Sequence, residues 1–492
     1  MTDSFDLCVI GSGPAGEKGA AQAAYFGKKV CLIERSPKPG GAAVNTGTIP
    51  SKTLRETALY LSGLRQRGLY GVEMRLKSDI TIGDFMHRER AVVDASWQLI
   101  GQNLDRHGIT QVQGQARFVS ADTVEVTRYK EEPHRISAGV FLIASGSRPA
   151  HPAEIPFDGR VVVNSDDVLS LTAIPRRLIV IGGGVIGCEY AGIFAALGVR
   201  VTIINSRERL LMQLDSDLSD ALRVEMTRRL GVQVMLNGTV RDVRVDGDVA
   251  TVSLLDGTAL VADCVLYCAG REGNTGDLAL DVAGVTVNAR GFIAVDDKYR
   301  TAQPTIIAAG DVIGFPALAS TAMEQARVAV CHAFDFRYKQ GVSAVLPYGV
   351  WTTPEVATVG LGEEDARAKG IPVEIGRSSF RINPRGQIIG DTEGFAKLIF
   401  RTDDKRLVGA SVMGEGACEL IHVPAAVLHF EGTLDYFIDA VFNYPSLGDA
   451  FKYAAYDGLQ RLQKRVSTAM EARSRTPALG LVTPVVTPPG TG

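Results

Sequence analysis

The chain contains one pattern twice, as FDLCVIGSGPAGEKGAAQAAYFGKKVCLIERS (Phe5–Ser36) and as RRLIVIGGGVIGCEYAGIFAALGVRVTIINSR (Arg176–Arg207). In each copy a short apolar run leads into G-x-G-x-x-G, then a stretch rich in small residues, a further Gly and a second apolar run. Strands that alternate with helices predict parallel sheets. We therefore expect an α/β fold that contains two Rossmann-like β-α-β units.

The glycines of both copies predict two dinucleotide sites. Glycines at this spacing let the backbone approach a pyrophosphate, whose charge lies at the helix N-terminus. One G-x-G-x-x-G also occurs in ordinary turns, and two tight turns without a ligand are the alternative interpretation. The predicted binding glycines are Gly11, Gly13 and Gly16 in the first copy, and Gly182, Gly184 and Gly187 in the second.

Length and composition favour a soluble enzyme of several domains. The 492 residues correspond to about three domains at about 150 residues each. A net charge of −3 gives no reason to expect nucleic acid or an anionic membrane as a partner. The apolar stretch from 178 to 199 has four glycines in its first half and Glu189 in its middle, so we expect a strand, a turn and a helix there, not a membrane span.

The N-terminus and the cysteines predict a cytoplasmic location. No basic segment followed by an apolar one opens the chain, so nothing indicates export. The seven cysteines form no CxxC pair and no metal-ligand spacing with the seven histidines, so no metal site is predicted. Cys264 and Cys268 fall in one expected strand, where four residues span about 13 Å, too far for a disulfide. We expect reduced cysteines in the core.

Three further turns resemble the places where such sheets close over a dinucleotide. VFLIASGSRP (Val140–Pro149) and CVLYCAGREGN (Cys264–Asn274) are apolar runs that end in small residues, and the second run includes Gly270. TIIAAGDVIG (Thr305–Gly314) places Asp311 just after an expected strand. Its carboxylate is a candidate acceptor for sugar-type hydroxyls of a cofactor, and the alternative is a capping or turn Asp.

This order of motifs, followed by a mixed C-terminal region, resembles the two-dinucleotide flavoprotein reductases, the class of glutathione reductase and lipoamide dehydrogenase. The resemblance covers residues 5 to about 465. It implies FAD at the first fingerprint, a nicotinamide dinucleotide at the second and a homodimer formed through the C-terminal domain. The domains that we expect are an FAD-binding domain (1–150 and 275–345), an NAD(P)-binding domain (151–274), an α+β dimerisation domain (346–465) and a disordered tail rich in Ser, Thr, Pro and Gly (466–492).

One departure from this class excludes disulfide chemistry. The class usually carries GGxCxxxGCxPSK with a redox disulfide beside the flavin, whereas this chain reads GGAAVNTGTIPSK, with Ala43 and Thr48 at the two Cys positions. The His-Pro…Glu that the partner subunit supplies in the class is Tyr444-Pro445…Asp449. Without a thiolate there is no nucleophile for disulfide exchange.

The residues that serve the flavin in this class are retained. Lys52 and Glu189 match the Lys and Glu that members place against the isoalloxazine near N5. The resemblance implies a catalytic role for both, because an ammonium there stabilises negative charge and the Glu balances a buried Lys. The alternative is a purely structural ion pair.

The segments GTIPSKTLRE, GVIGCEYA, AGDVIGFPALAS and FNYPS resemble one subfamily, the soluble pyridine nucleotide transhydrogenases. Members often keep the first Cys, which is Ala43 here. The resemblance implies ping-pong hydride transfer from NADPH to NAD through FAD. Two alternatives stay open: an NAD(P)H oxidoreductase that reduces a quinone, a dye or oxygen, and a flavoprotein subunit without activity.

The ends of the second apolar runs differ between the two copies. Twenty-three residues after the first Gly, one copy has Glu34 and the other has Asn205. A carboxylate accepts from a ribose 2′-OH and repels a 2′-phosphate, which suits FAD. Asn205 is neutral, and Arg207 is a candidate partner for a 2′-phosphate. We therefore expect the second site to take both NAD and NADP; the alternative is a turn Asn beside a solvated Arg.

Overall fold

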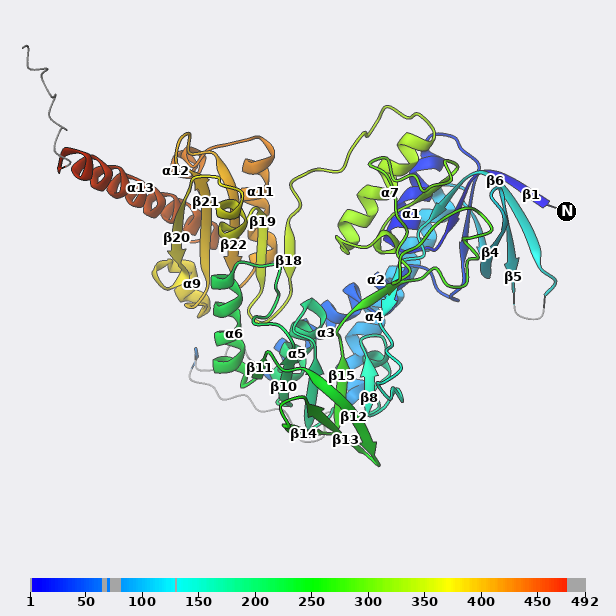
Figure 1. Cartoon of the computed structure of the whole chain (residues 1–492), viewed down its shortest axis with the longest axis horizontal. Helices are drawn as coiled ribbons and strands as arrows, with labels where there is room; N and C mark the ends of the chain where they lie inside the picture. Colours follow the sequence, from blue (N-terminus) through cyan, green and yellow to red (C-terminus); the bar gives the residue numbers. More distant parts are fainter. Residues whose placement is uncertain (1, 64–68, 71–80, 129–130, 476–492) are drawn as a thin grey trace, which may run out of the picture. The chain divides into compact units, whose positions relative to one another are not determined.

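The computed structural model describes residues 2–63, 69–70, 81–128 and 131–475 (Figure 1). The chain divides into two compact units. The first contains the residues up to Thr358 together with Met413–Glu419, and the second contains Val359–Val412 and the residues from Leu420 onward. The expected α/β fold with repeated parallel sheets is confirmed.

The first sheet has the strand order β3-β2-β1-β6-β5-β4, with β17 also paired to β6. Strands β1, β2, β3, β6 and β17 are parallel, whereas β4 and β5 are antiparallel to their neighbours. The bounds are β1 (Thr2–Ile10), β2 (Val30–Glu34), β3 (Thr110–Gln113), β4 (Gln115–Ser120), β5 (Thr123–Thr127), β6 (His134–Ile143) and β17 (Ile306–Ala308).

The second sheet repeats this arrangement with the order β11-β10-β9-β15-β8, all parallel. A separate antiparallel sheet, β12-β13-β14, follows β11 in the chain. The bounds are β8 (Val162–Asn164), β9 (Arg177–Ile181), β10 (Arg200–Asn205), β11 (Gln233–Leu236), β12 (Val240–Asp246), β13 (Val249–Leu254), β14 (Ala259–Ala262) and β15 (Cys264–Tyr267). A short antiparallel pair, β7 (Ser147–Pro149) with β16 (Arg271–Gly273), also belongs to this unit. Strand β18 (Tyr348–Val350) pairs with β19 (Val356–Gly360) in a five-stranded sheet of order β18-β19-β22-β21-β20, and the division between the units falls within β19.

The two fingerprints have nearly the same backbone geometry. Gly11 and Gly182 have φ of 100° and 114°, a region that L side chains rarely adopt. A Cβ at Gly16 would lie 1.8 Å from the Gly11 carbonyl oxygen, and one at Gly187 would lie 2.0 Å from that of Gly182. These glycines therefore let each helix pack directly on the turn that precedes it.

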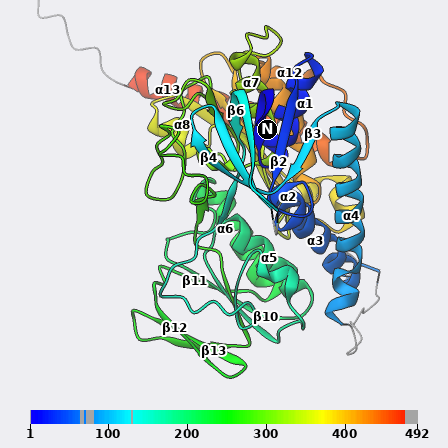
Figure 2. The same ribbon diagram turned by 90° about the vertical axis from the view of Figure 1, so that its right-hand side faces the viewer.

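Helices cover both sheets and are packed through small residues. Helix α1 (Pro14–Tyr25) lies beside α7 (Ala319–Ala333) (Figure 1). A Cβ at Gly19 would lie 2.4 Å from Leu142 of the first sheet. In the second copy α5 (Val185–Ala196) packs on β9 and β10 (Figure 2). The other helices of this unit are α2 (Gly41–Asn45), α3 (Thr48–Ser62), α4 (Ile82–Arg106) and α6 (Ser216–Leu230).

The second unit is built from strands β20, β21 and β22 with helix α13 on β20. A Cβ at Gly376 would lie 1.9 Å from the Ala454 carbonyl oxygen, so that α13 rests on the strand backbone. The bounds are β20 (Val373–Ser379), β21 (Phe395–Arg401), β22 (Leu407–Met413), α8 (Glu363–Ala368), α9 (Pro384–Ile389), α11 (His422–His429), α12 (Asp435–Asp439) and α13 (Ala450–Arg475). The short α10 (Ala417–Leu420) belongs to the first unit up to Glu419.

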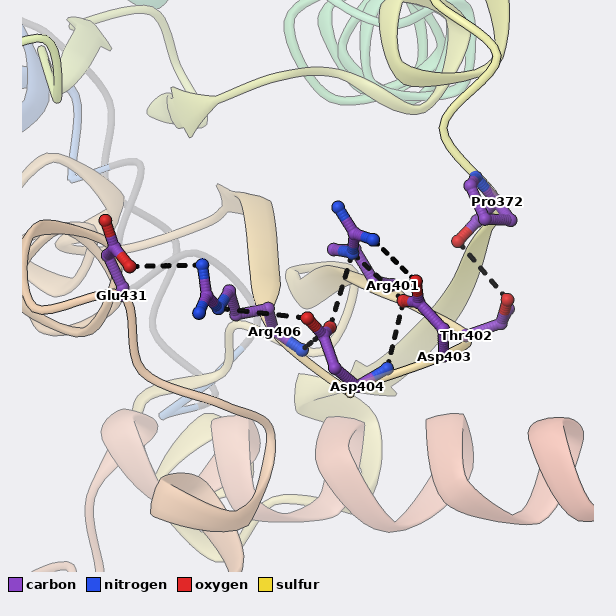
Figure 3. Close-up of polar contacts among 7 residues, drawn as sticks. All are labelled: Pro372, Arg401, Thr402, Asp403, Asp404, Arg406 and Glu431. Carbon is purple, nitrogen blue, oxygen red and sulfur yellow. Dashed lines mark hydrogen bonds and ion pairs between the residues drawn. The ribbon is translucent and has the colours of Figure 1, made fainter.

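A charged turn joins β21 to β22, and Figure 3 shows its contacts. The Arg401 guanidinium donates to both carboxylate oxygens of Asp403, at 2.9 and 2.5 Å. Arg406 pairs with Glu431 at 3.0 Å, and its backbone N–H donates to Asp404. Because these groups are largely exposed, we assign them to fixing the turn, with only a small contribution to stability.

The predicted start of the disordered tail at residue 466 is wrong. Helix α13 continues to Arg475, because VSTAMEARSR contains Ala, Met, Glu and Arg, which favour helix, and contains no Gly or Pro. The rest of the predicted tail, 476–492, lies outside the described residues. Among the helices that the structure describes, none is long and apolar enough to cross a membrane.

The glycine contacts lead to a stability prediction. Gly16→Ala should lower the free energy of unfolding by about 1–3 kcal/mol, since the new methyl group meets backbone that cannot move freely. Gly101→Ala in α4, where an added Cβ meets nothing within 4 Å, should instead stabilise by about 0.5–1 kcal/mol. Thermal unfolding of both variants would check this, and equal melting temperatures would contradict it.

Candidate functional site

The Gly40–Lys52 stretch folds into two helices at the wall of a cavity of about 840 Å³. Gly40 has φ of 104°, which permits the sharp entry into α2. Its N–H donates to Ser12 of the first fingerprint at 3.1 Å. Ala43, Thr48 and Lys52 all line the cavity. The two positions that carry thiols in the disulfide reductases therefore face the same space as Lys52.

An ion pair joins α3 to α5 at this cavity. Lys52 Nζ lies 2.7 Å from Glu189 Oε2, with the carboxylate side chain 5% exposed. The Trp351 backbone N–H donates to the other oxygen, Oε1, at 3.0 Å. Lys52 Nζ also lies 5.1 Å from the centre of the Trp351 ring. Glu189 is thus held by two donors, and the ammonium has a carboxylate and an aromatic face as neighbours.

Glu34 organises the first fingerprint. Its Oε2 accepts from the Ser12 N–H at 2.9 Å and from the Ser12 hydroxyl at 2.6 Å, and its Oε1 accepts from the Ser36 N–H at 2.8 Å. A carboxylate offers about four acceptor sites, so one more hydroxyl can still be bound. Glu34 also lines the cavity, as an adenosine-binding role requires.

Asn205 occupies the equivalent position in the second copy. Its Oδ1 accepts from the Gly183 N–H at 3.1 Å, and its Nδ2 donates to the carbonyls of Arg207 and Arg209 at 3.2 and 2.8 Å. Both amide hydrogens are therefore used within the chain, and only Oδ1 retains capacity toward a ribose hydroxyl. The Arg207 side chain is exposed.

Asp311 belongs to a short polar chain in the cavity wall. Ser147 donates its hydroxyl to Asp311 Oδ2 at 2.9 Å, and Arg271 donates to Ser147 Oγ and to the Ser147 carbonyl at 2.8 Å each. Arg271, Ser147 and Asp311 all line the cavity. One donated hydroxyl leaves acceptor sites on Asp311 for sugar-type hydroxyls.

The cavity contains most, but not all, of the residues that the sequence singles out. Gly16, Gly182 and Gly187 instead serve helix packing at the two turns, and Asn205 and Arg207 lie at the end of β10 outside the cavity lining. The predicted residues that line it are Gly11, Gly13, Glu34, Lys52, Gly184, Glu189, Gly270 and Asp311.

Some cavity residues escaped the sequence analysis. Trp351 contributes a backbone N–H, which no side-chain pattern reveals, and Ser12 and Ser147 look like ordinary loop serines. Arg271 could have been noticed as a basic residue after Gly270 in an expected closing turn. All four are placed by long-range contacts, which a linear pattern does not contain.

The cavity fits FAD and a nicotinamide nucleotide. Helices α1 and α5 both begin at a Gly without a side-chain cap, so their first N–H groups remain available to phosphate. Three buried polar atoms of lining residues have no hydrogen-bond partner among the described residues: Ser145 Oγ, Tyr190 Oη and Asn274 Oδ1. Uncompensated buried polar atoms are costly, which favours a polar ligand at this wall.

Two protein-family models of one family match most of the chain. The model described as pyridine nucleotide-disulphide oxidoreductase matches residues 5–326, and that of the same family's dimerisation domain matches residues 346–455. The chain belongs to this family. The oxidoreductase family uses FAD and pyridine nucleotides, as the sequence resemblance implies, and the dimerisation domain supports a homodimer.

The similar proteins include relatives named as transhydrogenases and a solved structure named as a disulfide reductase. The soluble pyridine nucleotide transhydrogenase of Mycobacterium tuberculosis (strain ATCC 25177 / H37Ra) is 41% identical over 460 residues, 93% of this chain and 98% of that protein. That of Colwellia psychrerythraea is 38% identical over 461 residues, again 93% and 98%. The copper(II) complex of the HOCl-induced flavoprotein disulfide reductase RclA from Escherichia coli has a TM-score of 0.83 at 27% identity, covering 92% of this chain and 99% of that one.

The cysteines of this family member are all free, and all lie within the described residues. Only Cys268 is partly exposed, and it lines the cavity. Burial, with a smaller effect of Cys188, raises the pKa of the Cys268 thiol well above its usual range. Burial likewise raises the pKa of Cys188 to about 12. The thiolate, the form needed for reaction, is therefore rare at neutral pH.

This gives a prediction for thiol reactivity. In the folded protein at pH 8, a thiol reagent such as Ellman's should modify no cysteine rapidly, because six of the seven are buried and the raised pKa of Cys268 keeps that thiol protonated. After unfolding, all seven should react. Reactivity of the folded protein should rise only when the pH is raised further. Rapid modification of Cys268 at pH 8 would contradict the assigned pKa direction.

A second prediction concerns the ion pair. Lys52→Met should slow reduction of the bound flavin by NADPH about 100-fold, the usual cost of one well-placed charged group in a site. Rapid-mixing measurements of flavin absorbance would test this.

The matched control is Lys18→Met. Lys18 pairs with Glu17 at 2.8 Å with similar exposure (27% and 8%, against 26% and 5%), and neither lines the cavity. Equal rates for the two variants would show that Lys52 has only a structural role.

Proposed function

We propose that this protein is an FAD-dependent transhydrogenase that moves hydride between NADPH and NAD in a ping-pong cycle. The observation that carries the proposal is the cavity in which the Lys52–Glu189 pair is kept while Ala43 and Thr48 replace the thiols. That wall therefore contains no disulfide that could accept electrons from the flavin. The curated relatives at 37–41% identity over about 93% of the chain carry the matching name.

The chain's own groups have distinct roles in this proposal. Bound FAD supplies the chemistry of accepting and returning a hydride. The Lys52 ammonium stabilises the negative charge that develops in the cavity, and Glu189 fixes its position. Glu34 and Asp311 accept hydrogen bonds from hydroxyl groups of FAD. The N-terminus of α1 binds the pyrophosphate of FAD, and that of α5 binds the pyrophosphate of the nicotinamide nucleotide. Positioning and charge suffice, because hydride transfer needs no nucleophile.

Use of both nucleotides follows from the neutral end of β10. Asn205 Oδ1 can accept a ribose 2′-OH, whereas its Nδ2 hydrogens are already donated within the loop. The exposed Arg207 supplies positive charge for a 2′-phosphate. With no carboxylate at position 205, neither nucleotide is repelled.

We extend the proposal to the domains and the compartment. Residues 1–150 with 275–345 would bind FAD, 151–274 the nicotinamide nucleotide, and 346–465 would form the dimer. Seven unpaired cysteines are typical of a reducing compartment, so we propose the cytoplasm.

The decisive experiment is reduction of thio-NAD by NADPH, with FAD content measured on the same sample. We expect turnover with thio-NAD, reduction of the flavin by both NADH and NADPH, and no reduction of glutathione disulfide or lipoamide. A quinone serves as the competing acceptor. Faster turnover of the quinone than of thio-NAD would contradict the proposal, and so would flavin reduction by only one nucleotide.

A further inference from the structure

The Lys52–Glu189 pair is supported by a second buried ion pair outside the cavity lining. Arg55 lies one helical turn after Lys52 on α3, with its side chain 4% exposed. Its Nη1 lies 3.2 Å from Glu355 Oε1, with that side chain 9% exposed. Its Nε donates to the Thr352 carbonyl at 3.0 Å. Arg55 does not line the cavity.

Arg55 Nη1 also lies 2.8 Å from Glu56 Oε1 on its own helix. Its contacts with Thr352 and Glu355 both hold one short segment, Trp351–Glu355. The segment is tied within itself, because Thr352 Oγ1 donates to the Pro354 carbonyl at 2.6 Å. It is fixed at its far end, where Glu355 Oε2 accepts from the Cys418 N–H at 3.3 Å. It also lies against α5, since a Cβ added at Gly192 would be 3.7 Å from the Thr353 nitrogen.

The near end of the same segment reaches the catalytic pair. The Trp351 N–H donates to Glu189 Oε1, while Glu189 Oε2 meets Lys52. Trp351 lines the cavity, and its ring faces the Lys52 ammonium. A carboxylate that is held at both oxygens cannot rotate freely, so the position of Lys52 depends on where the segment places the Trp351 N–H.

We propose that Arg55 is a positioning residue for hydride transfer, acting through the Trp351–Glu355 segment on the Lys52–Glu189 pair. A rigid guanidinium fork is suited to this task, because it binds a carboxylate and a carbonyl in fixed directions, which a lysine cannot do. The inference rests on the proposed function, since the step that it tunes is nucleotide-dependent flavin reduction.

The test compares Arg55→Lys and Glu355→Gln with the wild type. We expect each to slow flavin reduction by NADPH about ten-fold, with the KM for NADPH changed less than about two-fold, since small misplacements are costly for transfer. The control is Arg135→Lys, at an exposed Arg that lies 3.4 Å from Glu125. Wild-type rates in both variants would overturn the proposal.

A double-mutant cycle separates positioning from general destabilisation. If Arg55 acts through the ion pair, Arg55→Lys should have less than about a two-fold effect in a Lys52→Met background. The same ten-fold loss in both backgrounds would overturn the proposal. FAD content and cooperative unfolding of each variant confirm that it is folded.

A readout without turnover uses the two tryptophans of the chain, Trp97 and Trp351. In protein labelled with 5-fluorotryptophan and freed of FAD, Trp97→Phe assigns the fluorine resonances. Arg55→Lys should shift or broaden the Trp351 signal, and Arg135→Lys should not. An unchanged signal would overturn the proposal. Absence of hydride transfer in the wild type would refute the proposed function, while a shifted signal would still support the structural link.

Discussion

The contact between helix and turn at the two fingerprints is the constraint on which the cavity depends. A Cβ at Gly16 or Gly187 would meet a carbonyl oxygen at 2.0 Å or less, so only Gly lets α1 and α5 begin where they do. Each helix then points its uncapped N-terminus at the cavity. The same backbone geometry that packs the two helices on their sheets therefore leaves their first N–H groups facing the cavity.

Ion pairs and hydrogen bonds in the cavity wall join segments that are far apart in the chain. Lys52 and Glu189 are 137 residues apart, and Arg55 and Thr352 are 297 apart. These bonds tie α3, α5 and the Trp351–Glu355 segment into one wall of the cavity. Removing one partner of such a buried pair leaves an uncompensated charge, so we expect single substitutions in this wall to be costly.

The absence of thiols at positions 43 and 48 changes what this wall can do without changing its architecture. Solved structures with a TM-score of 0.83 include a protein described as a flavoprotein disulfide reductase, so the fold alone does not decide the reaction. Chemistry at the cavity wall does. Ala43 and Thr48 cannot exchange disulfides, whereas Lys52 still supplies positive charge.

The sequence by itself determined the two β-α-β units, their glycines and the loss of the disulfide, because these depend on local periodicity and on residue type at fixed spacing. It placed the start of the disordered tail at residue 466, whereas α13 continues through this Ser- and Thr-containing stretch to Arg475. Only the tertiary structure decided that the Asn205 side chain hydrogen-bonds Gly183 and the loop after β10. It also decided that the backbone N–H of Trp351 donates to Glu189. Backbone donors carry no sequence signature, and contacts between distant segments are fixed by packing.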